Sequence, residues 1–113
     1  MLGGAAIKTI TFVTKDVARA RDFYVNRLGF RLSEEAPEGD FMLDLGALQL
    51  SIVSENEHHP YRGGGAFLVF EAPNLDEIEA VLKKHAIAYK RIRSRKDFIT
   101  THDPDGYELL FAP

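Results

Sequence analysis

The chain has 113 residues, enough for one compact domain and no more. Hydrophobic residues make up 45% and charged residues 27%, a balance typical of globular proteins that excludes a disordered or collagen-like chain. The absence of cysteine excludes disulfide bonds, cysteine-ligated metals and a catalytic thiol, and a net charge of -3 provides no general attraction to nucleic acid or to an anionic membrane.

Nothing in the sequence predicts a membrane span or an export signal. No apolar run reaches the ~18 residues that a spanning helix needs. The first residues, 1–8, are too short and too weakly basic for a signal peptide. We therefore expect a cytoplasmic protein with neither a membrane nor a nucleic acid as its partner.

The first half of the chain predicts one strand, one helix and three further strands. The helix opens at Asp16, a favourable N-cap residue, and stops before Gly29, which suits the left-handed position after a helix. Between these two residues the apolar side chains recur on one helical face, at Val17, Ala20, Phe23, Tyr24 and Leu28. The β-branched and aromatic runs predict strands at 7–14, 30–34, 41–45 and 48–53.

The second half repeats this order. Its helix opens at Asn74, with Glu77 three residues later as in a capping box, and the offset that maps Asp16 onto Asn74 also maps the apolar residues of one helix onto those of the other. Strands are predicted at 66–71, 89–93, 98–102 and 107–111. We interpret the agreement as an internal duplication.

The predicted fold class is therefore α+β, with two tandem βαβββ modules in one domain over residues 1–113. Module one covers about residues 5–54, the linker 55–64 and module two about residues 65–113. Each half exposes one side of a mixed sheet, so the halves must pair. If helices cover one side, the other sides curve around a partly polar cavity, although the same faces would also suit packing against a partner subunit.

Two segments resemble the vicinal oxygen chelate superfamily, which includes glyoxalases, bleomycin-resistance proteins and ring-cleaving dioxygenases. The first is residues 9–30, with Asp16, the pair Phe23-Tyr24 and the run Leu28-Gly29-Phe30; the second is the turn Asp-Pro-Asp-Gly at 103–106. The resemblance implies paired βαβββ modules and commonly a homodimer whose chains complete each cavity. Members include metal-dependent lyases, dioxygenases, epimerases and thiol transferases, and also metal-free proteins that sequester antibiotics.

The resemblance also implies where metal ligands would lie: one on the first strand and one on the last strand of each module. These positions fall on Thr9, Gln49, Phe67 and Leu110, of which only Gln49 is a credible ligand. We therefore predict that the chain holds no metal and needs no cofactor. If the last strand is displaced by two residues, Glu108 takes the place of Leu110 on the same face.

The same strand faces supply the residues that we expect to bind a ligand. Apolar contacts are assigned to Met42, Phe67, Val69 and Leu110, and polar contacts to Thr9, Thr11, Gln49, Ser51 and Glu108. No catalytic residue is identified, and Glu108 is the one weak candidate, as a general base if it is buried. A strand-end surface carboxylate is an equally good interpretation of this residue.

Other groups are interpreted as structural or solvated. The linker should carry solvated His58 and His59, and the glycines at 63–65 should give it freedom. His85 suits the end of the second helix, whereas His102 could face the cavity, a subunit interface or solvent. The basic residues Lys90, Arg91, Arg93, Arg95 and Lys96 are expected to form a solvated edge rather than an anion site.

The sequence thus predicts a metal-independent protein that binds a small organic molecule in a cavity completed by a homodimer. A divergent metal-dependent lyase or dioxygenase of the same superfamily is the first alternative. A non-catalytic interaction module with a filled cavity is the second. Whether any reaction is catalysed is left open, as is the identity of the ligand.

Overall fold

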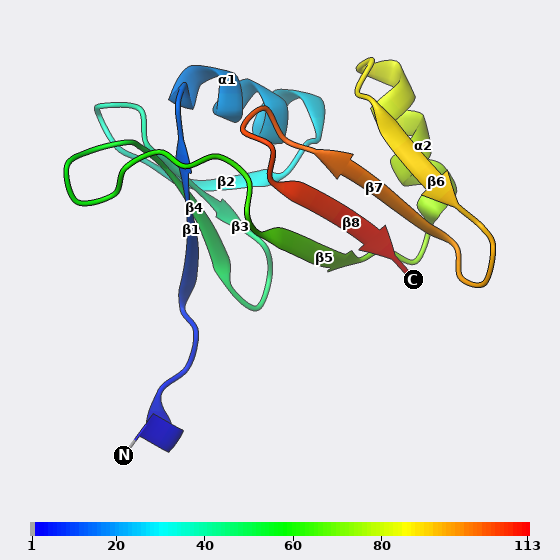
Figure 1. The fold of residues 1–113 in the computed structure, drawn as a ribbon, viewed down its shortest axis with the longest axis horizontal. Helices are drawn as coiled ribbons and strands as arrows, with labels where there is room; N and C mark the ends of the chain where they lie inside the picture. The colour runs from blue at the N-terminus through cyan, green and yellow to red at the C-terminus, as the bar shows by residue number, and fades with distance from the viewer. Residues whose placement is uncertain (1) are drawn as a thin grey trace.

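The structure, a computed structural model, describes residues 2–113 as eight strands with helices on one side of them (Figure 1). The strands are β1 (Thr9–Thr14), β2 (Arg31–Glu35), β3 (Phe41–Asp44), β4 (Gln49–Ser54), β5 (Phe67–Glu71), β6 (Tyr89–Ile92), β7 (Phe98–His102) and β8 (Glu108–Ala112). The helical segments are η1 (Leu2–Gly4), α1 (Val17–Arg21), η2 (Asp22–Arg27) and α2 (Leu75–Lys84).

The strands form two four-stranded mixed sheets with the same topology. Their orders are β1-β4-β3-β2 and β5-β8-β7-β6. In each sheet the first strand runs parallel to the last strand of its module, and the remaining neighbours are antiparallel. The prediction of an α+β fold with two tandem βαβββ modules is therefore confirmed.

Both helices begin as the sequence predicts. The Asp16 carboxylate accepts a hydrogen bond from the backbone N–H of Arg19 at 3.0 Å, and the Asn74 side chain accepts one from Glu77 N–H at 3.1 Å. The first helix differs after α1, because it continues as the wider π-helix η2 rather than as a regular α-helix. Phe23 and Tyr24 lie in this segment, and both are buried as predicted.

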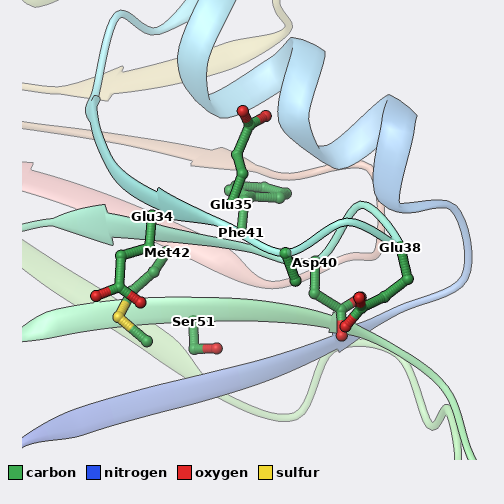
Figure 2. A pocket seen from close by; sticks show the side chains of 8 residues that line it. Glu34, Glu35, Glu38, Asp40, Phe41, Met42 and Ser51 are labelled. Atoms are coloured by element: carbon green, nitrogen blue, oxygen red, sulfur yellow. The ribbon is translucent and has the colours of Figure 1, made fainter.

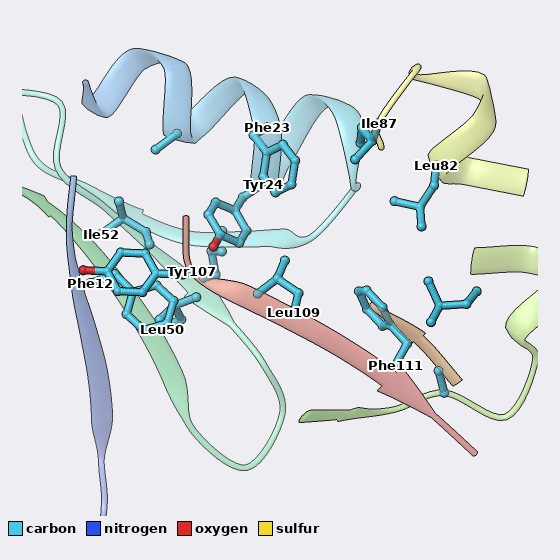
Figure 3. Packing of buried hydrophobic residues seen from close by; sticks show 14 of the residues in the cluster. Phe12, Phe23, Tyr24, Leu50, Ile52, Leu82, Ile87, Tyr107, Leu109 and Phe111 are labelled. Carbon is cyan, nitrogen blue, oxygen red and sulfur yellow. The ribbon is translucent and has the colours of Figure 1, made fainter. Parts of the chain in front are cut away.

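The hydrophobic core lies between the sheets and the helices and runs through both modules (Figure 3). Phe12, Leu50 and Ile52 face it from the first sheet, whereas Leu109 and Phe111 face it from the second. Alternate residues of β3, β4, β7 and β8 are buried, so the two-residue period in the sequence identifies the core face of these strands correctly. The opposite face of each sheet is left available for another role.

The turn at 103–106 joins module two to module one through buried polar contacts. Asp103 accepts hydrogen bonds from the N–H groups of Asp105 and Tyr107, each at 2.9 Å. Asp105 in turn accepts one from the Thr14 hydroxyl at 2.6 Å. Beside this turn the rings of Phe12 and Tyr107 stack with their centroids 3.9 Å apart. The turn therefore acts as a junction between modules as well as a hairpin.

The glycines at 63–65 do not leave the linker free, contrary to our expectation. Gly64 N–H donates to the carbonyl of Asp105 at 2.9 Å, which ties the linker to the same turn. All three glycines have positive φ, and a Cβ on Gly64 would lie 3.3 Å from the carbonyl oxygen of Gly106. Glycine is needed here for a left-handed backbone and for a close approach between chain segments.

Candidate ligand-binding site

The candidate site lies on the outer faces of the sheets, opposite the helices. In module one the strand register aligns two cross-strand rows of outward residues. One row contains Thr9, Gln49 and Asp44. The other contains Thr11, Ser51 and Met42, and it continues to Glu34 on β2. All five sequence-predicted residues of this module therefore share one face.

Module two carries two corresponding rows. The first row contains Phe67, Glu108 and His102, which belong to β5, β8 and β7. The second row contains Val69, Leu110, Thr100 and Lys90, and it crosses all four strands of the sheet. The four predicted residues of this module, Phe67, Val69, Glu108 and Leu110, thus also share one face.

The register corrects one positional assignment. Gln49 pairs with Thr9, and the residue that pairs with Phe67 in the same way is Glu108, not Leu110. Leu110 lies two residues further along β8, opposite Val69. The two positions point the same way because side chains alternate along a strand, so the sequence pattern could not distinguish them. Glu108 is therefore the counterpart of Gln49 in the second module.

The four positions implied for a metal are Thr9, Gln49, Phe67 and Glu108 in this corrected register. They do not fit a metal centre, because Phe67 has no donor atom and neutral hydroxyl and amide oxygens are weak ligands for transition metals. Within residues 2–113, no three His, Asp or Glu side chains are grouped closely enough to hold an ion. We derive no metal-assisted step for this chain.

A single chain distributes the predicted residues over separate hollows. Met42 and Ser51 line one hollow on module one, and Val69 lines a groove between the two sheets. Leu110 lines a hollow at the far end of β7 and β8, whereas Glu108 belongs to a hollow beside β6. None of these four hollows contains predicted residues of both modules.

The hollow on module one is acidic and has a volume of about 350 Å³ (Figure 2). Glu34, Glu38 and Asp40 surround Met42 and Ser51. Figure 2 shows Glu35 directed to the other side of the sheet, where it accepts a hydrogen bond from Arg21. The acidic character therefore comes from side chains that the sequence analysis did not single out. Their common outward direction depends on the β2–β3 hairpin and its irregular register.

The hollow beside β6 measures about 340 Å³ and is lined by Lys90, Thr100, His102 and Glu108 among others. His102 Nε2 lies 3.9 Å from Glu108 Oε1. The tight turn before β8 explains this pairing, because Asp103 N–H donates to Tyr107 carbonyl and so aligns residues 102 and 108. The sequence left three placements open for His102, and the structure places it on the outer face.

Large apolar side chains are uncovered on the same face of the sheet. Phe67 is 60% exposed and Val69 is 63% exposed, and both belong to β5, an edge strand of the second sheet. Two uncovered apolar side chains on one face make this face the candidate binding surface. Glu108 is only half-buried, so the condition under which we would assign it as a general base is not met.

The basic segment contains one exception to the predicted solvated edge. Arg91 points to the helix side, and its guanidinium donates to Asp76 at 2.8 Å, Glu79 at 3.1 Å and Asp97 at 2.8 Å. These hydrogen bonds, above all those to Asp97, raise the pKa of Arg91. The expectation was wrong for this residue because alternation along β6 sends Arg91 inward and Lys90 outward.

The remaining histidines lie away from both faces. His58 and His59 are exposed on the linker as predicted, and their backbone N–H groups both donate to the side-chain oxygen of Asn56. His85 ends α2 as predicted, and its carbonyl accepts a hydrogen bond from Arg27. None of these three residues is part of the candidate site.

With this geometry established, the comparisons identify the family. A sequence model of the Glyoxalase/Bleomycin resistance protein/Dioxygenase superfamily matches residues 6–111, and the chain belongs to this superfamily. The resemblance stated from the sequence is therefore confirmed.

Individual relatives agree with this membership. The uncharacterized protein YaeR of Escherichia coli (strain K12) is 27% identical, and the match covers 96% of each chain. The structure of TnmS3, an antibiotic binding protein from Streptomyces sp. CB03234, superposes with a TM-score of 0.77 at 20% identity, covering 99% of this chain and 98% of that one. The structure of lactoylglutathione lyase from Agrobacterium tumefaciens superposes with a TM-score of 0.74 at 17% identity, covering 97% of this chain and 94% of that one. The two structures share the fold of this chain.

A membrane-crossing helix is not found in the part of the chain that the structure describes, residues 2–113.

Proposed function

We propose that this protein binds a small organic molecule without a metal, on the outer faces of its sheets, in a cavity that a second copy of the chain completes. The observation that carries the proposal is the uncovered pair Phe67 and Val69, which share cross-strand rows with Glu108, Thr100 and Lys90 of the hollow beside β6. Apolar area supplies most of the affinity for such ligands, at about 25 cal/mol per Å², and a few placed polar groups supply selectivity. Both kinds of group are present on this face.

The donor set supports metal independence. A phenyl ring at position 67 occupies one of the four places that the resemblance implies for metal ligands, and a threonine hydroxyl occupies another. Gln49 and Glu108 alone supply too few donors and too little charge for a closed metal site. A metal-dependent lyase or dioxygenase would have to recruit donors from elsewhere. His102 is the nearest candidate, since its ring lies beside Glu108.

The uncovered outer faces support the second copy. Phe67 and Val69 are 60% and 63% exposed in the single chain. The outer face of a second copy laid over them would enclose this apolar area. Such a pairing would also bring the separate hollows of single chains together into one larger cavity.

The binding test uses N-phenylnaphthylamine, an uncharged dye whose fluorescence rises in apolar surroundings. We expect saturable binding by the purified protein, and we expect Phe67→Ser to weaken it about tenfold because one aromatic contact is lost. Ile7→Ser is the matched control, since Ile7 is 72% exposed but lies outside the strands. Equal effects of the two substitutions, or no saturable binding, would overturn the proposal.

The oligomeric state is tested separately by light scattering on the same preparation. A mass of twice 12.7 kDa supports the completed cavity. A monomer that still binds the dye would retain the binding function and remove the second copy from the proposal.

A further inference from the structure

We infer that the preferred ligand class is an amphipathic organic anion, with its apolar body on Phe67, Val69 and Leu110 and its acidic group between Lys90 and Thr100. This inference rests on the proposed function, because it names the ligand chemistry of the same face. The ligand would lie along the second cross-strand row of module two, whose members Thr100 and Lys90 line the hollow beside β6.

The row has an apolar end and a polar end. Val69 and Leu110 lie on β5 and β8, and Thr100 and Lys90 follow on β7 and β6. Neighbouring strands are about 4.8 Å apart, so the row extends over roughly 14 Å. A molecule with two fused or linked rings and a terminal acid group has this length. The face therefore fits an amphiphile lying across the strands.

Lys90 supplies the positive charge at the polar end. It takes part in none of the ion pairs within residues 2–113, whereas its neighbour Arg91 is neutralised on the other side of the sheet by three carboxylates. The one cation of β6 that remains on the outer face is therefore Lys90. An ammonium group without a carboxylate partner is well suited to pair with an anionic ligand.

Thr100 supplies a second observation that points to a ligand. Its Oγ1 atom is buried and has no hydrogen-bond partner in the described structure. A buried hydroxyl without a partner is costly, by about 1–3 kcal/mol, and a rotation about the Cα–Cβ bond that turns it into the hollow would let an oxygen of the ligand satisfy it. Thr100 lies directly opposite Lys90 in the register, so one acid group can contact both side chains.

Glu108 limits where the anion can lie. Its carboxylate is on the same face but in the adjacent row, beside His102 at 3.9 Å. Repulsion from Glu108 directs an acidic group away from this row and toward Lys90. Neutralising Glu108 is therefore expected to strengthen anion binding, and neutralising Lys90 is expected to weaken it.

The experiment compares two dyes that have the same phenylamino-naphthalene ring system and differ in charge. Anilinonaphthalenesulfonate carries a sulfonate, whereas N-phenylnaphthylamine carries none. We expect Lys90→Gln to weaken sulfonate-dye binding about fivefold at low ionic strength and Glu108→Gln to strengthen it, with little change for the neutral dye. Lys84→Gln is the matched control, because Lys84 is an exposed lysine on α2, behind the sheet.

A further variant tests the hydroxyl. Thr100→Val keeps the shape of the side chain and removes the orphaned donor, so it should weaken the sulfonate dye alone while leaving thermal stability unchanged or higher. Equal losses with Lys90→Gln and Lys84→Gln would overturn the inference, as would neutral-dye binding as tight as that of the sulfonate. In both of these cases saturable binding of the neutral dye still supports the proposed function, and failure of both dyes removes the proposed function itself.

Discussion

The hydroxyl of Tyr24 donates a 2.6 Å hydrogen bond to the carboxylate of Asp103, which lies 79 residues further along the chain. Tyr24 belongs to the helix of module one, and Asp103 opens the turn of module two. Burial is the main reason that the pKa of Tyr24 is raised, and burial also raises the pKa of Asp103 although its hydrogen bonds act in the opposite direction. The pair therefore links the modules through a buried, directional contact.

Removing this hydrogen bond should destabilise the whole domain. We expect Tyr24→Phe to lower the free energy of unfolding by about 1–2 kcal/mol, and Asp103→Ala by about 3 kcal/mol because it also leaves two backbone N–H groups without an acceptor. Urea unfolding of both variants and of the double variant measures the coupling between the two residues. Additive effects in the double variant would show that the two side chains do not interact.

The attachment of the linker predicts unequal costs for two glycine substitutions. Gly64 and Gly46 both have positive φ, but only Gly64 would bring a Cβ close to another backbone segment. Gly46→Ala should cost about 1 kcal/mol from backbone strain alone, and Gly64→Ala should cost more. Thermal unfolding of the two variants gives the comparison. A smaller loss for Gly64→Ala would mean that the linker is not fixed on the turn.

The Arg91 ion pairs predict a dependence of stability on acid pH. The guanidinium lowers the pKa of Asp97, and the hydroxyl of Tyr89 together with Arg91 lowers the pKa of Glu79. Lowered carboxyl pKa values stabilise the fold above the ordinary value of about 4, and this stabilisation is lost as the pH falls through the lowered values. Arg91→Gln should therefore reduce stability near neutral pH and flatten its decline in acid.

Thermal unfolding between neutral and strongly acidic pH measures this effect. Arg95→Gln provides the control, because Arg95 is exposed and takes part in no ion pair within residues 2–113. If the melting temperature of Arg91→Gln depends on pH in the same way as that of the unchanged protein, Arg91 does not lower the pKa values of Asp97 and Glu79.

Metal independence predicts that chelation leaves the protein unchanged. After expression in medium supplemented with divalent metals, the purified protein should carry no stoichiometric ion, and a chelator should alter neither its melting temperature nor its dye binding. Elemental analysis and thermal unfolding measure the two quantities. A tightly held ion, together with activity that a chelator abolishes and that ion restores, would favour the metal-dependent alternative.

The sequence predicted the scaffold better than the site. Helix caps and alternating strands are local signals, so Asp16, Asn74 and the core-facing residues such as Leu50 were identified correctly. The residue that pairs with Phe67 across the strands was not identified correctly. Glu108 and Leu110 point to the same side of β8, and only the hairpin geometry decides between them. The inward direction of Arg91 and the orphaned hydroxyl of Thr100 depend on packing between elements, which no local pattern reports.

The separation of the two strand faces has an evolutionary consequence. Helix-facing positions such as Leu50 and Leu109 hold the modules together, whereas equivalent outward positions have become Thr9 in one module and Phe67 in the other. Substitutions on the outward side therefore remove few packed contacts and cost little folding free energy. A lineage built on this scaffold is free to change the chemistry of its outward surface while its architecture stays intact.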